Sequence, residues 1–211
     1  SDLLRLRAGD EASCLNLYQP RQPRIVGAPD ALLDRNGFTF AASSARTPAE
    51  QRNPWLLLRC PLPDGAIPAI ADEAAALWQL HVQLGGDLHV PRDHGPAAHL
   101  RLVGLLHGSI LQGELVIAEA DFARLFPTTV GYSYFLIDTP PERVADVRQT
   151  LARELADFGL EVKSTAARLA DLRAVQNTYL STYQTLGGLG LLLGTVGLAA
   201  VLLRNVWERR S

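Results

Sequence analysis

Residues Leu186 to Leu203, LGGLGLLLGTVGLAAVLL, are the stretch that decides the architecture of this chain. None of these residues carries a charge, and Thr195 supplies the only hydroxyl group. At 1.5 Å of rise per residue, a helix of this length is roughly 27 Å long, close to the thickness of a bilayer's hydrocarbon core. Arg204, Arg209 and Arg210 follow at once. We therefore predict a transmembrane helix whose C-terminal end lies in the cytoplasm.

Four glycines recur in this stretch at spacings of three, four and three residues, so they share one face of the helix. They are Gly187, Gly190, Gly194 and Gly197. In water each would weaken a helix by about 1 kcal/mol relative to alanine, whereas in lipid a face of small residues lets a second helix approach closely. The pattern favours a membrane helix over a buried or amphipathic helix of a soluble protein. It also predicts helical neighbours, and the sequence contains no second candidate span.

The segment before the span continues the same helical pattern. Apolar and aromatic residues recur at helical spacing from about Thr165 onward, and neither proline nor a turn signal interrupts them before Leu186. We predict one continuous helix of about forty residues. Its first part, residues 165–185, is an amphipathic stalk, and residues 186–203 form the transmembrane helix. Residues 204–211 then begin a cytoplasmic segment.

Residues 1–164 are long enough for one ordinary domain. From residue 67 onward the patterns predict an α+β fold with a mixed sheet and β-α-β units. The predicted elements are a strand at Pro68 to Ala71, a helix from Asp72 to Leu84, a hairpin of strands at 87–90 and 99–106, a strand at 114–118 and a short helix at 121–126. In the hairpin, His89 and His99 are expected to face each other.

Residues 132–163 give the clearest local pattern. Tyr132 to Ile137 is strand-like, and Thr139 with Glu142 resembles a capping box with proline at the first helical position. Five apolar residues follow at spacings of three, four, four and three: Val144, Val147, Leu151, Leu155 and Phe158. Gly159 ends the helix, and Leu160 to Lys163 alternates as a strand does. We predict a strand–helix–strand unit, whose crossover is right-handed if the two strands are parallel.

Residues 1–54 have less regular patterns, and the sequence does not determine their fold. A short helix ending at Arg35, a strand at 38–42 and an exposed, mobile loop at 45–53 are expected, followed by a strand at 55–58. The two cysteines, Cys14 and Cys60, could pair outside the cytoplasm or remain separate. Both alternatives stay open.

Catalytic motifs are not found. Five histidines lie between His81 and His107, but their spacings match no common metal-binding motif. No phosphate-binding loop and no nucleophile elbow occur. The formal net charge is −2, and there is no basic run before the C-terminus, which argues against nucleic acid as a partner. We predict a protein that is not an enzyme and that holds no metal or cofactor.

The order of motifs from Gly65 to Phe126 resembles the extracytoplasmic domain of FtsX-like, MacB-type ABC transporter permeases. The similar segments include an apolar strand leading to Asp72 and Glu73, the run Leu84 to Val90, and the strand Leu100 to Leu106. The strand–helix–strand unit and the long helix entering the membrane are also similar to that family, as is the basic end Glu208, Arg209 and Arg210. The resemblance is good from about residue 60 and poor before it.

This resemblance implies a periplasmic domain inserted between the first two membrane helices of a permease in the inner (plasma) membrane. Its partners would be a cytoplasmic ATP-binding subunit or domain, a second permease copy, the other transmembrane helices and membrane lipid. The family implies export, lipoprotein or lipid extraction, or mechanotransmission driven by ATP hydrolysis. Glu208, Arg209 and Arg210 are candidates for docking the ATPase. Because the chain begins at Ser1 and contains no methionine, we expect an earlier transmembrane helix that exports the domain.

Two other interpretations were weighed. The first is a single-pass sensor or ligand-binding module outside the cytoplasm, which would carry a cytoplasmic signalling domain. The second is a membrane-tethered hydrolase built on the histidines. The permease interpretation accounts for the glycine face and the basic end together, and it is therefore preferred.

Overall fold

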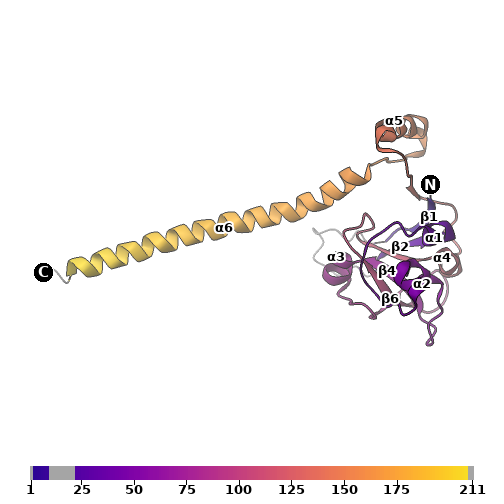
Figure 1. Ribbon diagram of the computed structural model, residues 1–211, viewed down its shortest axis with the longest axis horizontal. Coiled ribbons are helices and arrows are strands. Elements are labelled where there is room, and N and C mark those ends of the chain that lie inside the picture. Colours follow the sequence, from indigo (N-terminus) through magenta and orange to yellow (C-terminus); the bar gives the residue numbers. More distant parts are fainter. Residues whose placement is uncertain (1, 10–21, 209–211) are drawn as a thin grey trace. The chain divides into compact units, whose positions relative to one another are not determined.

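The computed structural model describes residues 2–9 and 22–208 (Figure 1). The chain divides into two units, Ser1–Ser164 and Thr165–Ser211. The first unit contains a mixed β-sheet with helices on both faces, and the second contains the long helix α6, Thr165–Glu208. The predicted fold class, α+β with a mixed sheet followed by a long helix, is confirmed.

One sheet of eight strands forms the centre of the first unit in the described part of the chain. The strands are β1 Asp2–Arg7, β2 Arg24–Ala28, β3 Phe40–Ser43, β4 Ile67–Asp72, β5 Asp87–Val90, β6 Ala98–Leu106, β7 Glu114–Ala118 and β8 Tyr134–Leu136. Their order is β3-β6-β4-β7-β2-β1-β8, and β5 also pairs with β6. β4 is parallel to β6 and β2 is parallel to β7, while the other pairs are antiparallel. All the strands predicted between residues 67 and 118 are confirmed.

Each face of the sheet has its own apolar core, because successive side chains of a strand point to opposite faces. On β4, Ile67, Ala69 and Ala71 belong to the first core, and Ile70 belongs to the second. Every residue of β4 is buried, so both faces need a helical cover. The helix α4 (Glu119–Leu125) and the π-helical turn η2 (Ala76–Leu80), which follows the short helix α3 (Glu73–Ala75), contribute to the first core. The helix α1 (Asp30–Arg35) and the 3-10 helix η1 (Pro54–Arg59) contribute to the second.

The conformations predicted within residues 45–58 are wrong. Residues 48–52 form the helix α2, Pro48–Arg52, where a loop was expected, although the segment contains no buried residue and is exposed as predicted. Thr47 Oγ1 accepts a hydrogen bond from the backbone N–H of Glu50, and the Glu50 carboxylate accepts one from the backbone N–H of Thr47, which makes a capping box. The expected strand at 55–58 is part of η1, which buries Trp55 and Leu58 completely or nearly so. A short apolar run is buried in either conformation, so its composition does not distinguish them.

The helix expected from Asp72 to Leu84 begins as predicted but ends early. The side chain of Asp72 caps it by accepting a hydrogen bond from the N–H of Ala74. After one turn of α3 the helix continues as the wider π-helical turn η2, and it ends at His81. The φ of His81, 54°, lies in the left-handed region. The buried carboxylate of Asp72 also accepts hydrogen bonds from the N–H and hydroxyl of Ser109, which fixes the loop before β7 to the start of this helix.

The unit at residues 132–163 forms only in part. Its strand is β8, and its helix is α5, Val144–Glu154, which a 3-10 turn η3, Pro141–Arg143, precedes. The expected capping box of Thr139 and Glu142 is absent, because the N-cap of η3 is Pro140, one residue later, and no side-chain cap hydrogen bond forms there. A second 3-10 turn, η4 Ala156–Phe158, follows α5, and Gly159 adopts a left-handed conformation. Residues 160–163 have no strand pairing, so the predicted second strand is wrong for this structure.

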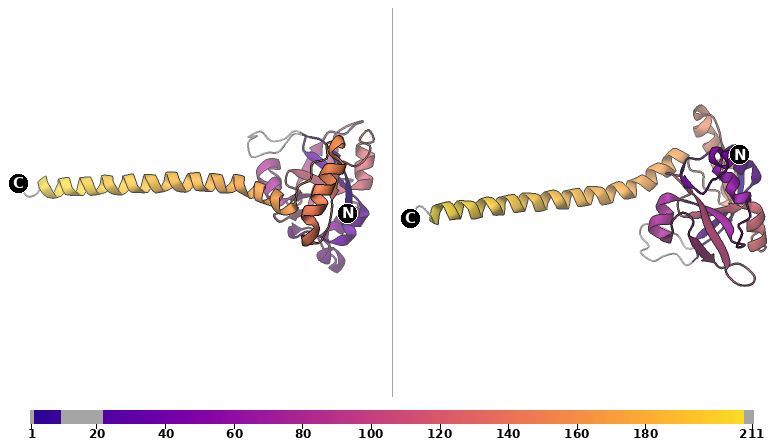
Figure 2. Two further views of the ribbon diagram at one scale, coloured as in Figure 1. Left: turned by 90° about the horizontal axis from the view of Figure 1, so that it is seen from above. Right: turned by 60° about the horizontal axis from the view of Figure 1, so that its bottom comes forward.

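The second unit is a single uninterrupted helix. α6 extends over 44 residues, and it passes through the stalk and the apolar stretch without a break at the Gly187–Gly188 pair. Two further directions of view show the same continuous coil (Figure 2). The prediction of one continuous helix is confirmed.

Candidate membrane-spanning and coupling site

The apolar part of α6 is long enough to cross a membrane. The qualifying window, Ser181–Leu202, contains 22 residues with a mean hydropathy of 2.0. At 1.5 Å per residue it is roughly 33 Å long, against about 30 Å for the hydrocarbon core of a bilayer. None of the window is buried within the chain. Its large apolar side chains from Leu186 to Leu202 are 56% to 74% exposed. A surface of this kind is stable in lipid and would aggregate in water.

Two threonines of the window use their hydroxyl groups inside the helix. Thr185 Oγ1 donates a hydrogen bond to the carbonyl oxygen of Ser181 at 2.8 Å. Thr195 Oγ1 donates one to the carbonyl oxygen of Leu192 at 2.9 Å. In hydrocarbon an unpaired hydroxyl costs several kcal/mol, so this internal pairing suits a lipid environment.

The glycine face of α6 is open. A Cβ atom added at Gly187, Gly190, Gly194 or Gly197 would meet no heavy atom within 4 Å, apart from the helix's own nearby backbone. The backbone is therefore bare along this face, as it is where small residues let two transmembrane helices pack closely. The face is present, but the described residues contain nothing that packs on it. Its role in helix–helix packing stays a prediction.

The proposed coupling segment lies at the edge of the described residues. Glu208 is the last residue of α6, whereas Arg209 and Arg210 lie outside the described residues, as does Cys14. Cys60 is a free, partly exposed thiol. The structure therefore neither supports nor opposes a docking role for Glu208, Arg209 and Arg210, or a pairing of Cys14 with Cys60.

Two of the five histidines face each other across the β5–β6 hairpin, as expected. The rings of His89 and His99 stack with centroids 5.1 Å apart and planes 2° from parallel. His99 Nε2 lies 3.1 Å from the carboxylate of Asp87. Arg101 donates two hydrogen bonds to the same carboxylate, at 2.7 and 3.0 Å, and these donors, with a smaller contribution from His99, lower the pKa of Asp87 to about 2. Asp87 thus stays ionised at neutral pH, and its carboxylate contacts both Arg101 and His99.

Because these hairpin side chains contact one another, they leave few donor atoms to bind a metal ion. Arg101 also pairs with Asp64 at 2.7 Å, which ties the loop before β4 to the hairpin. Elsewhere, His107 Nδ1 lies 3.4 Å from a Glu73 carboxylate oxygen. Across residues 2–9 and 22–208, no group of three metal-binding side chains comes together. Three of the five histidines, His89, His99 and His107, thus make ring-stacking or carboxylate contacts on the first unit.

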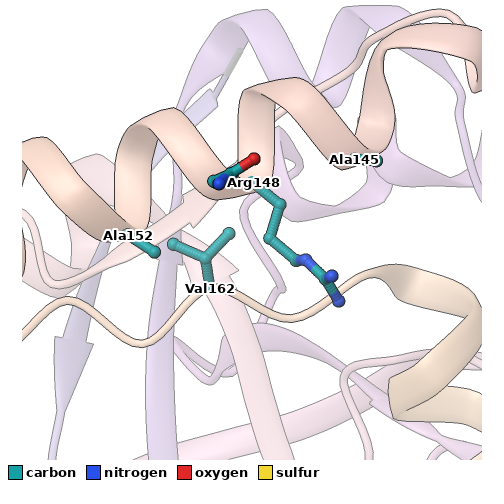
Figure 3. Close-up of a pocket in the computed structure, with 5 residues that line it drawn as sticks. Ala145, Arg148, Ala152 and Val162 are labelled. Atoms are coloured by element: carbon teal, nitrogen blue, oxygen red, sulfur yellow. The ribbon is translucent and has the colours of Figure 1, made fainter.

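A cavity of about 480 Å³ lies beside α5 (Figure 3). Ala145, Arg148, Gln149 and Ala152 of α5 line one side, and Val162 lines the other. In Figure 3 the side chain of Val162 lies between those of Ala152 and Arg148. The lining contains one cation and no acidic group. Sequence reasoning missed this cavity because it expected α5 and residues 160–163 to be packed against the sheet.

No family model matches the chain, and no curated protein matches it. Among solved structures it is similar to the extracellular domain of the ABC-type transporter YknZ from Gram-positive bacteria, with 11% identity, a TM-score of 0.36, and coverage of 75% of this chain and 73% of that chain. A permease domain from Porphyromonas gingivalis has 14% identity and a TM-score of 0.34, with coverage of 72% and 62%. The periplasmic region of MacB from Actinobacillus actinomycetemcomitans has 11% identity and a TM-score of 0.32, with coverage of 72% and 63%. The chain thus spans less than two thirds of the last two.

Proposed function

We propose that this chain is the extracytoplasmic domain and the following transmembrane helix of an ABC permease subunit. In this proposal a cytoplasmic ATPase drives a movement that α6 carries to the first unit. The partners are that ATPase, a second permease copy and further transmembrane helices, in an inner (plasma) membrane. The work done outside would be export, extraction of a lipid or lipoprotein, or activation of another protein.

The observation that carries this proposal is the continuity of α6. Its 44 residues correspond to roughly 66 Å of helix, of which about 30 Å suffices to cross the hydrocarbon core. Residues 165–180, roughly 24 Å of helix, precede the apolar window as a stalk on the domain side of the span. An anchor needs no such stalk, whereas a hydrogen-bonded helix shared by two compartments can transmit a displacement between them. The sequence resemblance of residues 65–126 to MacB-type permeases supports the same function.

Breaking α6 at the membrane surface is expected to uncouple the two compartments. Gln184 is exposed near the domain-side end of the apolar window, with no turn signal beside it. Proline there removes a helical hydrogen bond and costs about 3 kcal/mol in a helix interior. The measurement uses the full-length protein with its ATPase in nanodiscs, spin-labelled through Gln51→Cys and Asn205→Cys. Pulsed EPR is expected to show a label–label distance that shifts on addition of ATP, and Gln184→Pro is expected to abolish that shift.

Gln184→Ala is the matched control, because it keeps the helix intact and is expected to retain the ATP-dependent shift. ATP hydrolysis is measured in parallel, to show that the ATPase itself is active in both variants. A shift that survives Gln184→Pro unchanged would contradict the coupling function.

One observation favours a second function, a membrane-anchored sensor. The cavity beside α5 is within the size range of small-molecule sites, and Arg148 could pair with an anionic ligand. A sensor of this kind does not depend on ATP. The same EPR experiment separates the two functions, because the sensor predicts a label–label distance that ATP leaves unchanged in the unmodified protein.

A further inference from the structure

The cavity beside α5 follows from the order of side chains on that helix. Ala145, Arg148, Gln149 and Ala152 lie at spacings of three, one and three residues, so they share one face of α5. The two alanines are two turns apart, roughly 10 Å along the helix axis. Their short side chains leave space on either side of Arg148 and Gln149. With Val162 on the other side, this space is a cavity of about 480 Å³ (Figure 3).

The cavity is accessible to a small molecule from solvent. Its four lining residues on α5 are exposed, and Val162 is partly buried. None of the five lining residues belongs to a strand, so a ligand can enter without any rearrangement of the sheet. A volume of about 480 Å³ lies within the range of small-molecule sites, roughly 300 to 1,000 Å³.

The lining combines apolar walls with two polar side chains. The side chains of Ala145, Ala152 and Val162 contain only carbon and hydrogen. Arg148 contributes a guanidinium group, which stays protonated in proteins, and Gln149 contributes an amide. None of the described residues that line the cavity is acidic. The cavity is therefore complementary to a ligand that has an apolar body and one anionic group.

The guanidinium group of Arg148 has no anion in the structure, unlike other cations of the same segment. Arg153 Nε lies 3.2 Å from a carboxylate oxygen of Glu154. Lys163 Nζ lies 2.7 Å from a carboxylate oxygen of Glu161. Within the described ranges, 2–9 and 22–208, no ion pair or side-chain hydrogen bond joins Arg148 to another residue. Arg148 is therefore the cation of the cavity that can pair with a ligand.

The charge of the site favours a carboxylate over a phosphate. A guanidinium group matches a carboxylate in geometry, because two parallel N–H groups meet two oxygen atoms. A phosphate monoester carries roughly −1.5 to −2 charges at neutral pH, which one arginine does not balance. A carboxylate group alone would fill only a small part of about 480 Å³, and the rest of the lining is apolar. A small monocarboxylate with an apolar body satisfies both the charge and the volume.

We propose that this cavity binds a small monocarboxylate, whose apolar body lies against Ala145, Ala152 and Val162. Arg148 pairs with the carboxylate, and the amide of Gln149 donates a hydrogen bond to it. Such a ligand would be the signal of the membrane-anchored sensor described above, and this role rests on that second function. The binding itself needs neither ATP nor a second copy of the chain.

Binding is measured on the complete chain in nanodiscs of zwitterionic lipid. The probe is para-fluorohydrocinnamate, a monocarboxylate with a fluorinated phenyl ring. Its fluorine NMR signal is expected to shift and broaden until the site is saturated. Empty nanodiscs are the blank, because they report how much probe partitions into lipid. Absence of saturable binding beyond this blank would overturn the proposed site.

Arg148→Gln tests the ion pair, because it removes the charge and keeps a side chain with amide donors. Hydrogen bonds between charged groups are about twice as strong as neutral ones, so the affinity for the probe is expected to fall at least about tenfold. Arg153→Gln is the matched control, since Arg153 lies about 140° around the helix from Arg148 and outside the lining. This control is expected to bind as the unmodified chain does. Equal affinities of the two variants would contradict a role for Arg148.

Two further comparisons separate charge recognition from apolar binding and locate the site. The neutral probe para-fluorohydrocinnamamide is expected to bind at least about tenfold more weakly than the carboxylate. The double variant Ala145→Leu/Ala152→Leu narrows the cavity without removing a polar group, and leucine keeps the helix intact. It is expected to lose saturable binding. Equal binding of the two probes, or undiminished binding by the double variant, would refute the carboxylate site.

The outcome is independent of the coupling function. Probe binding is measured without the ATPase, whereas the EPR distance is measured with it. A chain that binds the probe while its EPR distance ignores ATP would retain the carboxylate site and refute the coupling function. A chain that binds no probe while ATP shifts its EPR distance would refute the carboxylate site and retain the coupling function.

Discussion

A chain carrying Leu193→Asp is expected to stay out of the membrane. Leu193 lies near the middle of the apolar window and is 64% exposed within the chain, so its surroundings would be lipid. On the scale of insertion free energies, leucine at the centre of a span contributes about −0.5 kcal/mol and aspartate about +3 kcal/mol. The difference of roughly 3.5 kcal/mol reduces the ratio of inserted to non-inserted chains by more than about a hundredfold.

The measurement is the fraction of the chain that remains with membranes after an alkaline carbonate wash. The unmodified chain and the control Leu193→Ala are expected to remain membrane-bound, because alanine is close to neutral in such a helix. Release of the aspartate variant alone supports a spanning helix. An aspartate variant that stays as resistant to the wash as the alanine variant would mean that this segment of α6 is not in hydrocarbon.

Replacing Trp55 with alanine is expected to be the most destabilising single truncation of the first unit. Trp55 is fully buried in the second core, where Phe38 and Phe40 contact it edge-on with ring centroids 5.5 and 5.6 Å away. Such aromatic pairs add to the free energy gained by burial. Truncating a buried tryptophan to alanine costs about 3–5 kcal/mol, a large part of the stability of a domain.

Trp78 provides the matched control, because it is the same residue type but is 74% exposed. Trp78→Ala is expected to change the free energy of unfolding by no more than about 0.5 kcal/mol. Pulse proteolysis in a urea series gives the unfolding midpoint of the first unit in each variant. Equal midpoints for the two variants would contradict the burial of Trp55 in the core.

The central sheet could be predicted from sequence because its strands carry strong local signals. Ile67 to Asp72 is apolar on both faces, and the hairpin strands at 87–90 and 98–106 alternate on either side of a turn. α6 was equally clear, since its apolar window has neither a breaker nor a charge. The errors fall where local signals are ambiguous. Thr47 and Glu50 form a capping box inside a segment rich in turn residues, and Trp55 to Leu58 is too short to separate a strand from a 3-10 helix.

The candidate site could be predicted only in part, for a physical reason. Hydropathy and the glycine spacing locate the span and its small-residue face, because both are properties of one helix. Strand pairing, in contrast, depends on residues that are far apart in the sequence, so a local pattern does not determine it. Residues 160–163 have a strand-like sequence, but they belong to no strand of the sheet. Nothing in the described residues packs on the glycine face, so helix–helix packing there and a docking role for Glu208 stay predictions.

The most direct test of the central claim is the side of the membrane on which each unit lies. Two single-cysteine forms of the full-length protein are needed in cells, Gln51→Cys on α2 and Asn205→Cys after the span, with the native cysteines replaced by serine. Both positions are exposed. A membrane-impermeant maleimide is expected to label residue 51 in intact cells, and residue 205 only after permeabilisation. Labelling of residue 205 in intact cells, or protection of residue 51 until permeabilisation, would contradict a helix that joins an outer domain to a cytoplasmic coupling end.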